Sequence, residues 1–284
     1  MASPATIPAS IAATARELEA PADQVDDALA WLAARPEVEP ALERQHGRLV
    51  AAIGTLEVPD WPADLAADTE RFQLLALLAA VPATRAWYSA HSVPPDVARD
   101  SLGDLPEKLR NYGIAATGVD WLTMIVTARV FVLGRLQFEP RATVPGTGET
   151  AFGVHIPELG PLDEAACDAS LARASAFFAS VLGDSTTRAF VCESWLMDDQ
   201  LAHYLPAESN ILKFQRRFEP VDTPETDAPC ENVTHGDTAV AKFVFRRPLG
   251  ELPTIAPASR LERAVLDHLA AGGHWRERAG VIRF

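Results

Sequence analysis

The first part of the chain carries apolar residues at helical spacing. Ala28, Trp31 and Leu32 form the clearest stripe, in a segment that Asp23 can cap and that runs into Pro36. Other segments with one apolar face also predict helices: residues 37–56, 70–92, 94–113 and 120–134. No convincing alternation of apolar and polar residues appears in this part of the chain. The pattern therefore predicts a helical first half whose stripes pack into a core.

Later in the chain the spacing changes from helical to alternating. Leu136 and Phe138 face one side of a short segment, and Gln137 and Glu139 face the other. Segments of this kind predict strands: residues 135–140, 150–156, 188–195, 209–220 and 238–248. Two segments with helical spacing, residues 163–183 and 259–273, lie among them. The second half is therefore expected to combine a sheet with helices.

Local start and stop signals support the two helices of the second half. Asp163 can cap the first helix and Gly183 can end it. Ser259 and Glu262 have the spacing of a capping box at the start of the second. The predicted fold class is α+β, with a helical domain followed by a mixed sheet flanked by helices.

Composition narrows the possible partners. The formal net charge is −14 and the sequence pI is about 4.9, so nucleic acid and anionic membranes would be repelled. The three cysteines lie far apart and the seven histidines form no HExxH-type motif, so no metal site is expected. We find no basic, apolar leader at the N-terminus and no uncharged apolar window of eighteen residues, and we expect a reduced, cytoplasmic protein.

One short stretch departs from this acidic balance. "SNILKFQRRFEP", residues 209–220, places Lys213, Arg216 and Arg217 close together. If the stretch is a strand, Arg216 falls on its apolar face, where an unpaired charge is costly. We therefore expect a buried carboxylate partner, or a bulge near Gln215–Arg217 that changes the register. The alternative is a solvated edge strand with a salt bridge.

Polar residues on the predicted strands are candidates for chemistry. Glu193, at the end of a strand, and His155, near the end of another, are the candidate general bases, although each could also be structural. Cys192 could be a nucleophile, but its neighbours are apolar and offer no thiolate stabiliser. Trp195 is either a packing residue or a platform for a ligand. Further candidates to line a substrate cleft are Gln137, Glu139 and Asn210.

Several long segments of the second half resemble a known family. "GVHIPELGPLDEAACDASLARASAFFASVLG", "RAFVCESWLMDDQLAHYLPAESNILKFQRRF" and "LERAVLDHLAAGGHWRERAG" are similar to the GNAT-like C-terminal domain of a family of bacterial acyltransferases. The helices that precede them, ending in "FVLGRLQFE", resemble the N-acyltransferase N-terminal domain. The resemblance places the first domain at residues 1–133 and the GNAT-like domain at residues 134–284.

The resemblance implies acyl transfer from a CoA or carrier-protein thioester to a small amine or similar nucleophile. In GNAT enzymes a bulged strand and its splayed neighbour form the donor cleft, and a glycine-rich loop at a helix N-terminus holds the pyrophosphate. The usual [Q/R]xxGx[G/A] loop is not found here, and "AAGGHW" follows a helix rather than preceding one. We therefore expect Lys213, Arg216 and Arg217 to bind the phosphates of acyl-CoA.

Two other functions remain open at this point. A non-catalytic module could keep the fold and bind acyl-CoA or a carrier protein, which the missing glycine loop favours. A thioesterase that uses Cys192 is the third possibility. The acyltransferase is favoured because the polar strand residues are grouped.

Overall fold

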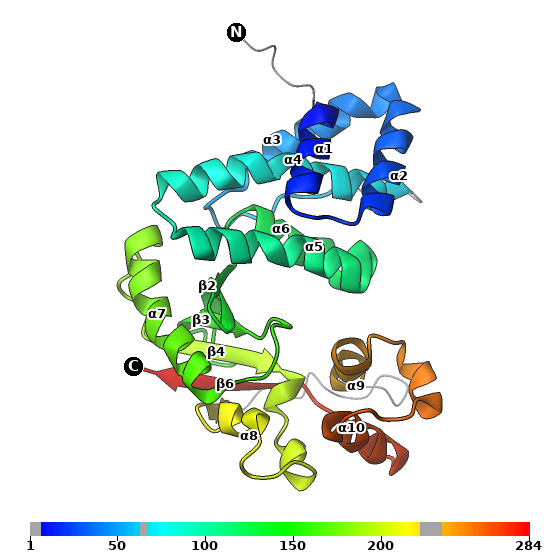
Figure 1. Cartoon of the computed structure of the whole chain (residues 1–284). Helices are drawn as coiled ribbons and strands as arrows, with labels where there is room; N and C mark the ends of the chain where they lie inside the picture. The colour runs from blue at the N-terminus through cyan, green and yellow to red at the C-terminus, as the bar shows by residue number, and fades with distance from the viewer. Residues whose placement is uncertain (1–6, 63–67, 222–234) are drawn as a thin grey trace. The chain divides into compact units, whose positions relative to one another are not determined.

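The computed structural model describes residues 7–62, 68–221 and 235–284 (Figure 1). The chain divides into two compact units, Met1–Val132 and Leu133–Phe284. Helices dominate the first unit, and the second combines a sheet with helices. The predicted α+β fold class is confirmed.

The first unit is built around α4, which is apolar on nearly every side. Its helices are α1 (Ile7–Glu17), α2 (Ala22–Ala33), α3 (Glu39–Ala52), α4 (Thr69–Ala90), α5 (Pro95–Thr117) and α6 (Val119–Val126). The residues from Phe72 to Val81 in α4 are all buried, and α1, α2 and α3 pack against this helix. A helix without a polar face is stable only when neighbouring helices cover it.

Three boundaries in this unit differ from the sequence prediction. Helix α1 was not predicted, and α5 continues to Thr117, past a kink at Gly113 where φ is 68°. Residues 120–134 are predicted as one helix. In the structure, helix α6 ends at Val126, and Phe131–Leu133 form strand β1. Gly134, with φ of 83°, then turns the chain, which only glycine does without strain.

The second unit contains most of a six-stranded sheet in the order β1-β2-β3-β4-β6-β5. Its further strands are β2 (Leu136–Thr143), β3 (Thr150–His155), β4 (Ala189–Ser194), β5 (Glu219–Val221) and β6 (Arg278–Arg283). Strands β3 and β4 are parallel, and the pairs β2–β3, β4–β6 and β5–β6 are antiparallel. The predicted strands β2, β3 and β4 are confirmed, whereas β6 was not predicted.

Helix α7 (Glu164–Leu182) connects the parallel strands β3 and β4 and packs on the sheet. Asp163 caps it by accepting from the Ala166 amide at 2.9 Å, and Gly183 ends it in the left-handed conformation, both as predicted. Phe178 stacks on Phe152 of β3 with ring centroids 4.5 Å apart. Length and composition alone would let α7 cross a membrane, but this stacking is what a core helix shows.

Between β4 and β6 lies a helical subdomain, residues 195–215 and 235–276. It contains α8 (Asn210–Gln215), α9 (His235–Val240), a π-helix (Ala241–Phe245) and α10 (Arg260–Ala270), with shorter 3₁₀ turns. Its core is apolar and consists of Trp195, Leu201, Leu205, Leu212, Ala239, Val240, Val265 and Trp275. The predicted cap of α10 is present, because Ser259 accepts from the Glu262 amide at 3.1 Å; the Glu262 carboxylate accepts from the amide of Ala258, one residue before the N-cap.

Two strand predictions in this subdomain are wrong. Within residues 209–220, α8 replaces most of the expected strand, and within residues 238–248 the chain is helical up to Phe245. Phe214 and Phe218 fit both a two-residue and a four-residue period, and their rings lie 5.1 Å apart. Ser209 caps α8 by accepting from the Leu212 amide at 3.4 Å. The spacing of Phe214 and Phe218 fits a strand and a helix equally well, and the cap at Ser209 favours the helix.

Candidate active site

Three predicted site residues lie on one face of the β2–β3 hairpin. Gln137 pairs with His155, and Glu139 pairs with Gly153 in the antiparallel register. Residues at paired positions point to the same side of a sheet, so the three polar side chains are neighbours. The His155 Nε2 atom lies 3.0 Å from the Glu139 Oε2 atom. The side chains of His155 and Glu139 keep 33% and 25% of their exposure, so a ligand can reach them.

A β-bulge lies directly beside this pair. The register of β2 against β3 shifts by one residue between Glu139 and Ala142. Arg141 has φ of 59°, and Pro140 has no N–H for the ladder, so the strand cannot remain regular there. The prediction of a bulge near Gln215–Arg217 is wrong, because these residues lie at and just after the end of helix α8.

Gly153 makes room for the Glu139 side chain. A Cβ atom on Gly153 would lie 3.2 Å from the Glu139 Cγ atom and 3.2 Å from the Ala142 Cβ atom. Contacts this short would push the carboxylate away from its present place. The glycine and the bulge together therefore set the position of the carboxylate that holds His155.

The parallel strands β3 and β4 pair over a short distance. The described residues of these strands form two ladder pairs, Phe152 with Phe190 and Gly153 with Val191. Both strands continue beyond them, β3 to His155 and β4 to Ser194, and β4 stays paired with β6 on its other side. Among the described residues, the ladder between the two parallel strands therefore ends before the strands do, and β3 ends at His155.

Glu193 and Cys192 lie on this last part of β4. Glu193 is exposed and lies opposite Ala279 of β6. Cys192 is 1% exposed, and burial, with a smaller effect of the Glu193 charge, raises the pKa of its thiol to about 12. A thiol with such a pKa stays protonated near neutral pH and is a poor nucleophile. The geometry gives the Cys192 thioesterase no support.

The three cations of the basic stretch lie on and just after α8 and line a groove of about 520 Å³. The groove also contains Glu164, Asp168 and Glu208. Lys213 lies 3.2 Å from Glu164, whose hydrogen bond raises the Lys213 pKa. Arg217 lies 2.7 Å from Asp168 and donates to the Glu164 carbonyl at 3.0 Å. The groove therefore contains both signs of charge and lies along the first two turns of α7.

Arg216 does not lie on a buried face, contrary to the prediction. It is exposed at the C-terminal end of α8 and donates to the Ala207 carbonyl at 2.8 Å. Residues two apart do not share a face in a helix, so Arg216 does not lie on the apolar face of Phe214 and needs no buried partner.

Trp195 and Asn210 lie away from the hairpin face. Trp195 is 6% exposed and belongs to the core of the helical subdomain. Asn210 is exposed at the first position of α8. Neither contributes to the His155–Glu139 pair.

The glycines of "AAGGHW" lie in a segment whose amides already have partners in the protein. The Trp275 amide donates to Asp237 Oδ1 at 2.8 Å, and the Arg276 amide donates to Asp198 Oδ2 at 2.8 Å. Both carboxylates are buried, and burial raises the pKa of Asp198. These carboxylates hold the segment in place. In a phosphate-binding loop, by contrast, the amides would be available to the ligand.

Comparisons with known proteins identify the family of the chain. The model of the N-acyltransferase N-terminal domain matches residues 9–123, and that of the GNAT-like C-terminal domain matches residues 130–282. The chain belongs to this acyltransferase family. The resemblance found in the sequence is thus confirmed for both domains. No curated protein matches the chain.

Solved structures of acyltransferases are similar over nearly the whole chain. One is in complex with decanoyl-CoA and teicoplanin, with 32% identity, a TM-score of 0.79, and coverage of 96% of this chain and 87% of that one. Another, in complex with CoA and 10C-teicoplanin, has 30% identity, a TM-score of 0.79, and coverage of 100% and 91%. A third, in complex with decanoyl-CoA, has 33% identity, a TM-score of 0.80, and coverage of 96% and 87%. The chain is therefore similar to enzymes that bind acyl-CoA.

Proposed function

We propose that the protein transfers an acyl group from acyl-CoA to the amine of a small molecule, with His155 as the general base. The observation that carries the proposal is the His155–Glu139 pair, 3.0 Å apart, at the end of a strand that stops pairing with its parallel neighbour. The similarity to acyltransferases that bind acyl-CoA supports the reaction class and the donor.

The pair can accept the proton that amine acylation releases. In this proposal the Glu139 carboxylate accepts a hydrogen bond from Nε2 of His155, and Nδ1 takes the proton. The acceptor ammonium first gives one proton to Nδ1, directly or through a water, which leaves a neutral amine. The amine nitrogen then attacks the thioester carbonyl carbon and a C–N bond forms. The C–S bond breaks, and the CoA thiolate leaves and takes up the second proton of the nitrogen. The carboxylate stabilises the imidazolium formed meanwhile.

The donor would lie along the ends of β3 and β4. Backbone N–H groups of the last residues of β4 can polarise the thioester carbonyl, as in other GNAT enzymes. The phosphates would reach the groove at the start of α7, where Lys213, Arg216 and Arg217 lie. Binding would exchange part of their contacts with Glu164, Asp168 and Glu208 for contacts with phosphate oxygens.

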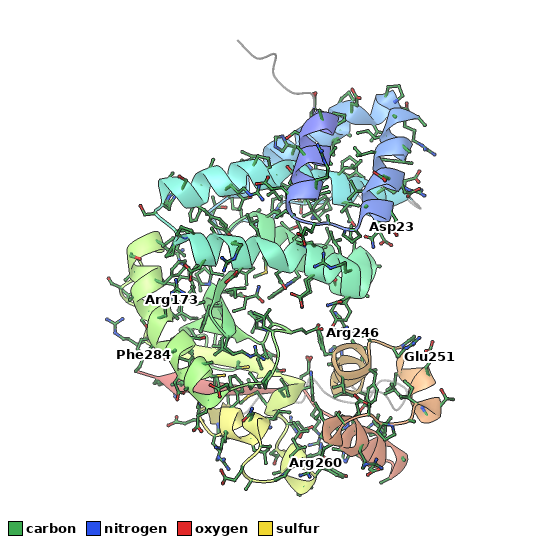
Figure 2. The ribbon with its side chains drawn as sticks, in the orientation of Figure 1. Asp23, Arg173, Arg246, Glu251, Arg260 and Phe284 are labelled. Carbon is green, nitrogen blue, oxygen red and sulfur yellow. The ribbon has the colours of Figure 1, made fainter. Side chains whose placement is uncertain are left out.

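A charge-removing substitution tests this placement of the donor. Arg217→Gln is expected to weaken acyl-CoA binding about three- to tenfold, because a charge-assisted bond to phosphate is lost while its present carboxylate partner is also released. Dissociation constants at two salt concentrations measure the effect. Arg173→Gln, which removes the same charge from α7 outside the groove, is the control (Figure 2). Equal affinities of both variants and the wild type would exclude the groove as the phosphate site.

The acceptor is proposed to be a cationic amine. The net charge of −14 attracts ammonium groups and repels anions at long range. The related structures contain teicoplanin, so teicoplanin-type molecules are the first acceptors to test.

Turnover with decanoyl-CoA and a panel of amines tests the proposed function. We expect equal amounts of CoA thiol and of acceptor enlarged by one acyl group, measured by thiol titration and mass spectrometry. Acyl-CoA bound to the folded protein should also raise its melting temperature by mass action. A raised melting temperature with no turnover on any amine would instead support the non-catalytic binding module.

A further inference from the structure

The loop that follows His155 connects the end of β3 to the start of α7, over residues 156–163. Arg135 binds this loop through three backbone carbonyls. Its Nε, Nη1 and Nη2 atoms donate to Pro161 at 2.8 Å, Pro157 at 3.0 Å and Gly160 at 2.7 Å. A planar guanidinium that donates to three carbonyls fixes the path of the backbone between them.

A second contact to the same loop comes from the helical subdomain. Arg246 Nη2 lies 2.6 Å from Glu158 Oε2. Arg246 directly follows the π-helix and has φ of 53°, and its amide donates to the Lys242 carbonyl at 3.1 Å. A non-glycine residue in the left-handed region is unfavourable by itself, so the surrounding contacts must hold it there. Glu158 keeps 19% of its side-chain exposure and Arg246 keeps 53%.

The ion pair thus connects two parts of the chain that are 88 residues apart. Glu158 comes three residues after His155, and Arg246 ends the π-helix of the helical subdomain. π-Helices are rare and frequently occur at functional sites. The pair therefore connects the helical subdomain to the loop that follows His155.

We propose that Glu158 and Arg246 are positioning residues, which hold the loop after His155 so that the imidazole stays in its productive place. This inference rests on the proposed function, in which His155 takes the proton. Neither residue needs to touch the substrate. Their effect would appear in kcat, because a misplaced base slows the proton transfer while the donor still binds.

Arg246→Gln is the first test, with Arg247→Gln as its matched control. Arg247 is the next residue and pairs with Glu251 at 3.7 Å, and both side chains of that pair are more than half exposed. We expect Arg246→Gln to lower kcat about fivefold with the dissociation constant of acyl-CoA unchanged, since loss of the pair reduces the fraction of correctly positioned loop. Arg247→Gln should keep the wild-type kcat.

Amide hydrogen exchange separates a positioning role from a general loss of structure. In Arg246→Gln the peptide covering residues 156–162 should exchange faster, while peptides from α4 should be unchanged. The double variant Glu158→Arg/Arg246→Glu should recover most of the lost kcat, because the opposite charges can pair again. Wild-type kcat and wild-type loop exchange in Arg246→Gln would overturn the inference.

The same experiments separate failure of this inference from failure of the proposed function. If His155→Asn is inactive and Arg246→Gln is as active as the wild type, His155 remains the base and only the positioning role is wrong. If His155→Asn keeps full activity, the proposed function fails, while faster exchange of the loop in Arg246→Gln would still show that the ion pair holds it.

Discussion

Replacing His155 by asparagine is expected to lower kcat by about 10²–10⁴-fold, the usual contribution of a general base. The asparagine amide can still hydrogen-bond to Glu139 but cannot accept the amine proton. Acyl-CoA binding should change little, because the imidazole acts on the acceptor and not on the donor phosphates. Steady-state rates at saturating donor and acceptor, with a separate binding titration of acyl-CoA, measure both quantities.

Two other variants test the roles of the carboxylates Glu139 and Glu193. Glu139→Gln should also lower kcat, by roughly tenfold or more, because a neutral amide stabilises the imidazolium less than a carboxylate does. Glu193→Gln should remain close to the wild type, since Glu193 is exposed and is not paired with His155. A large loss in Glu193→Gln with an active His155→Asn would instead assign the base to Glu193.

Substitution of Gly236 by alanine should strongly destabilise the helical subdomain. A Cβ atom at this position would lie 2.4 Å from the carbonyl carbon and oxygen of Trp275 and 2.5 Å from the Arg276 nitrogen. These are backbone atoms, held by the bonds of Asp237 and Asp198, so they cannot move aside cheaply. We expect a loss of about 3 kcal/mol, or roughly 6–12 °C in melting temperature for a unit of this size.

Gly250→Ala provides the control for that measurement. Gly250 lies in a short helical turn of the same subdomain, and a Cβ atom there would meet nothing within 4 Å. Its melting temperature should stay within about 2 °C of the wild type. Equal melting temperatures for both variants would show that the Trp275 backbone yields easily, which would contradict the rigid role given to the buried carboxylates.

The elements that the sequence predicts correctly are those with local signals. Strands β2 and β3 alternate cleanly, and α7 has an N-cap at Asp163 and a stop at Gly183. Helix α8 also has a local signal, the cap at Ser209, whereas α9 could not be predicted in this way. Asp237 in α9 is fixed by the Trp275 amide, a contact across 38 residues that no local pattern reveals.

The candidate site was predicted in part for a similar reason. Gln137, Glu139 and His155 could each be selected as polar positions on strands. Their meeting depends on the register of β2 against β3, and that register changes at the bulge beside Glu139. The sequence signal for the bulge, Pro140 next to a polar strand face, was available but was not used. The ion pair between Glu158 and Arg246 has no local signal at all.

Chemical rescue tests the central claim most directly. His155→Ala should be nearly inactive with acyl-CoA and amine, and added imidazole should restore part of the rate in proportion to its concentration. The wild type should not respond, because its base is already in place. Substantial activity of His155→Ala without imidazole would contradict the assignment of His155 as the base.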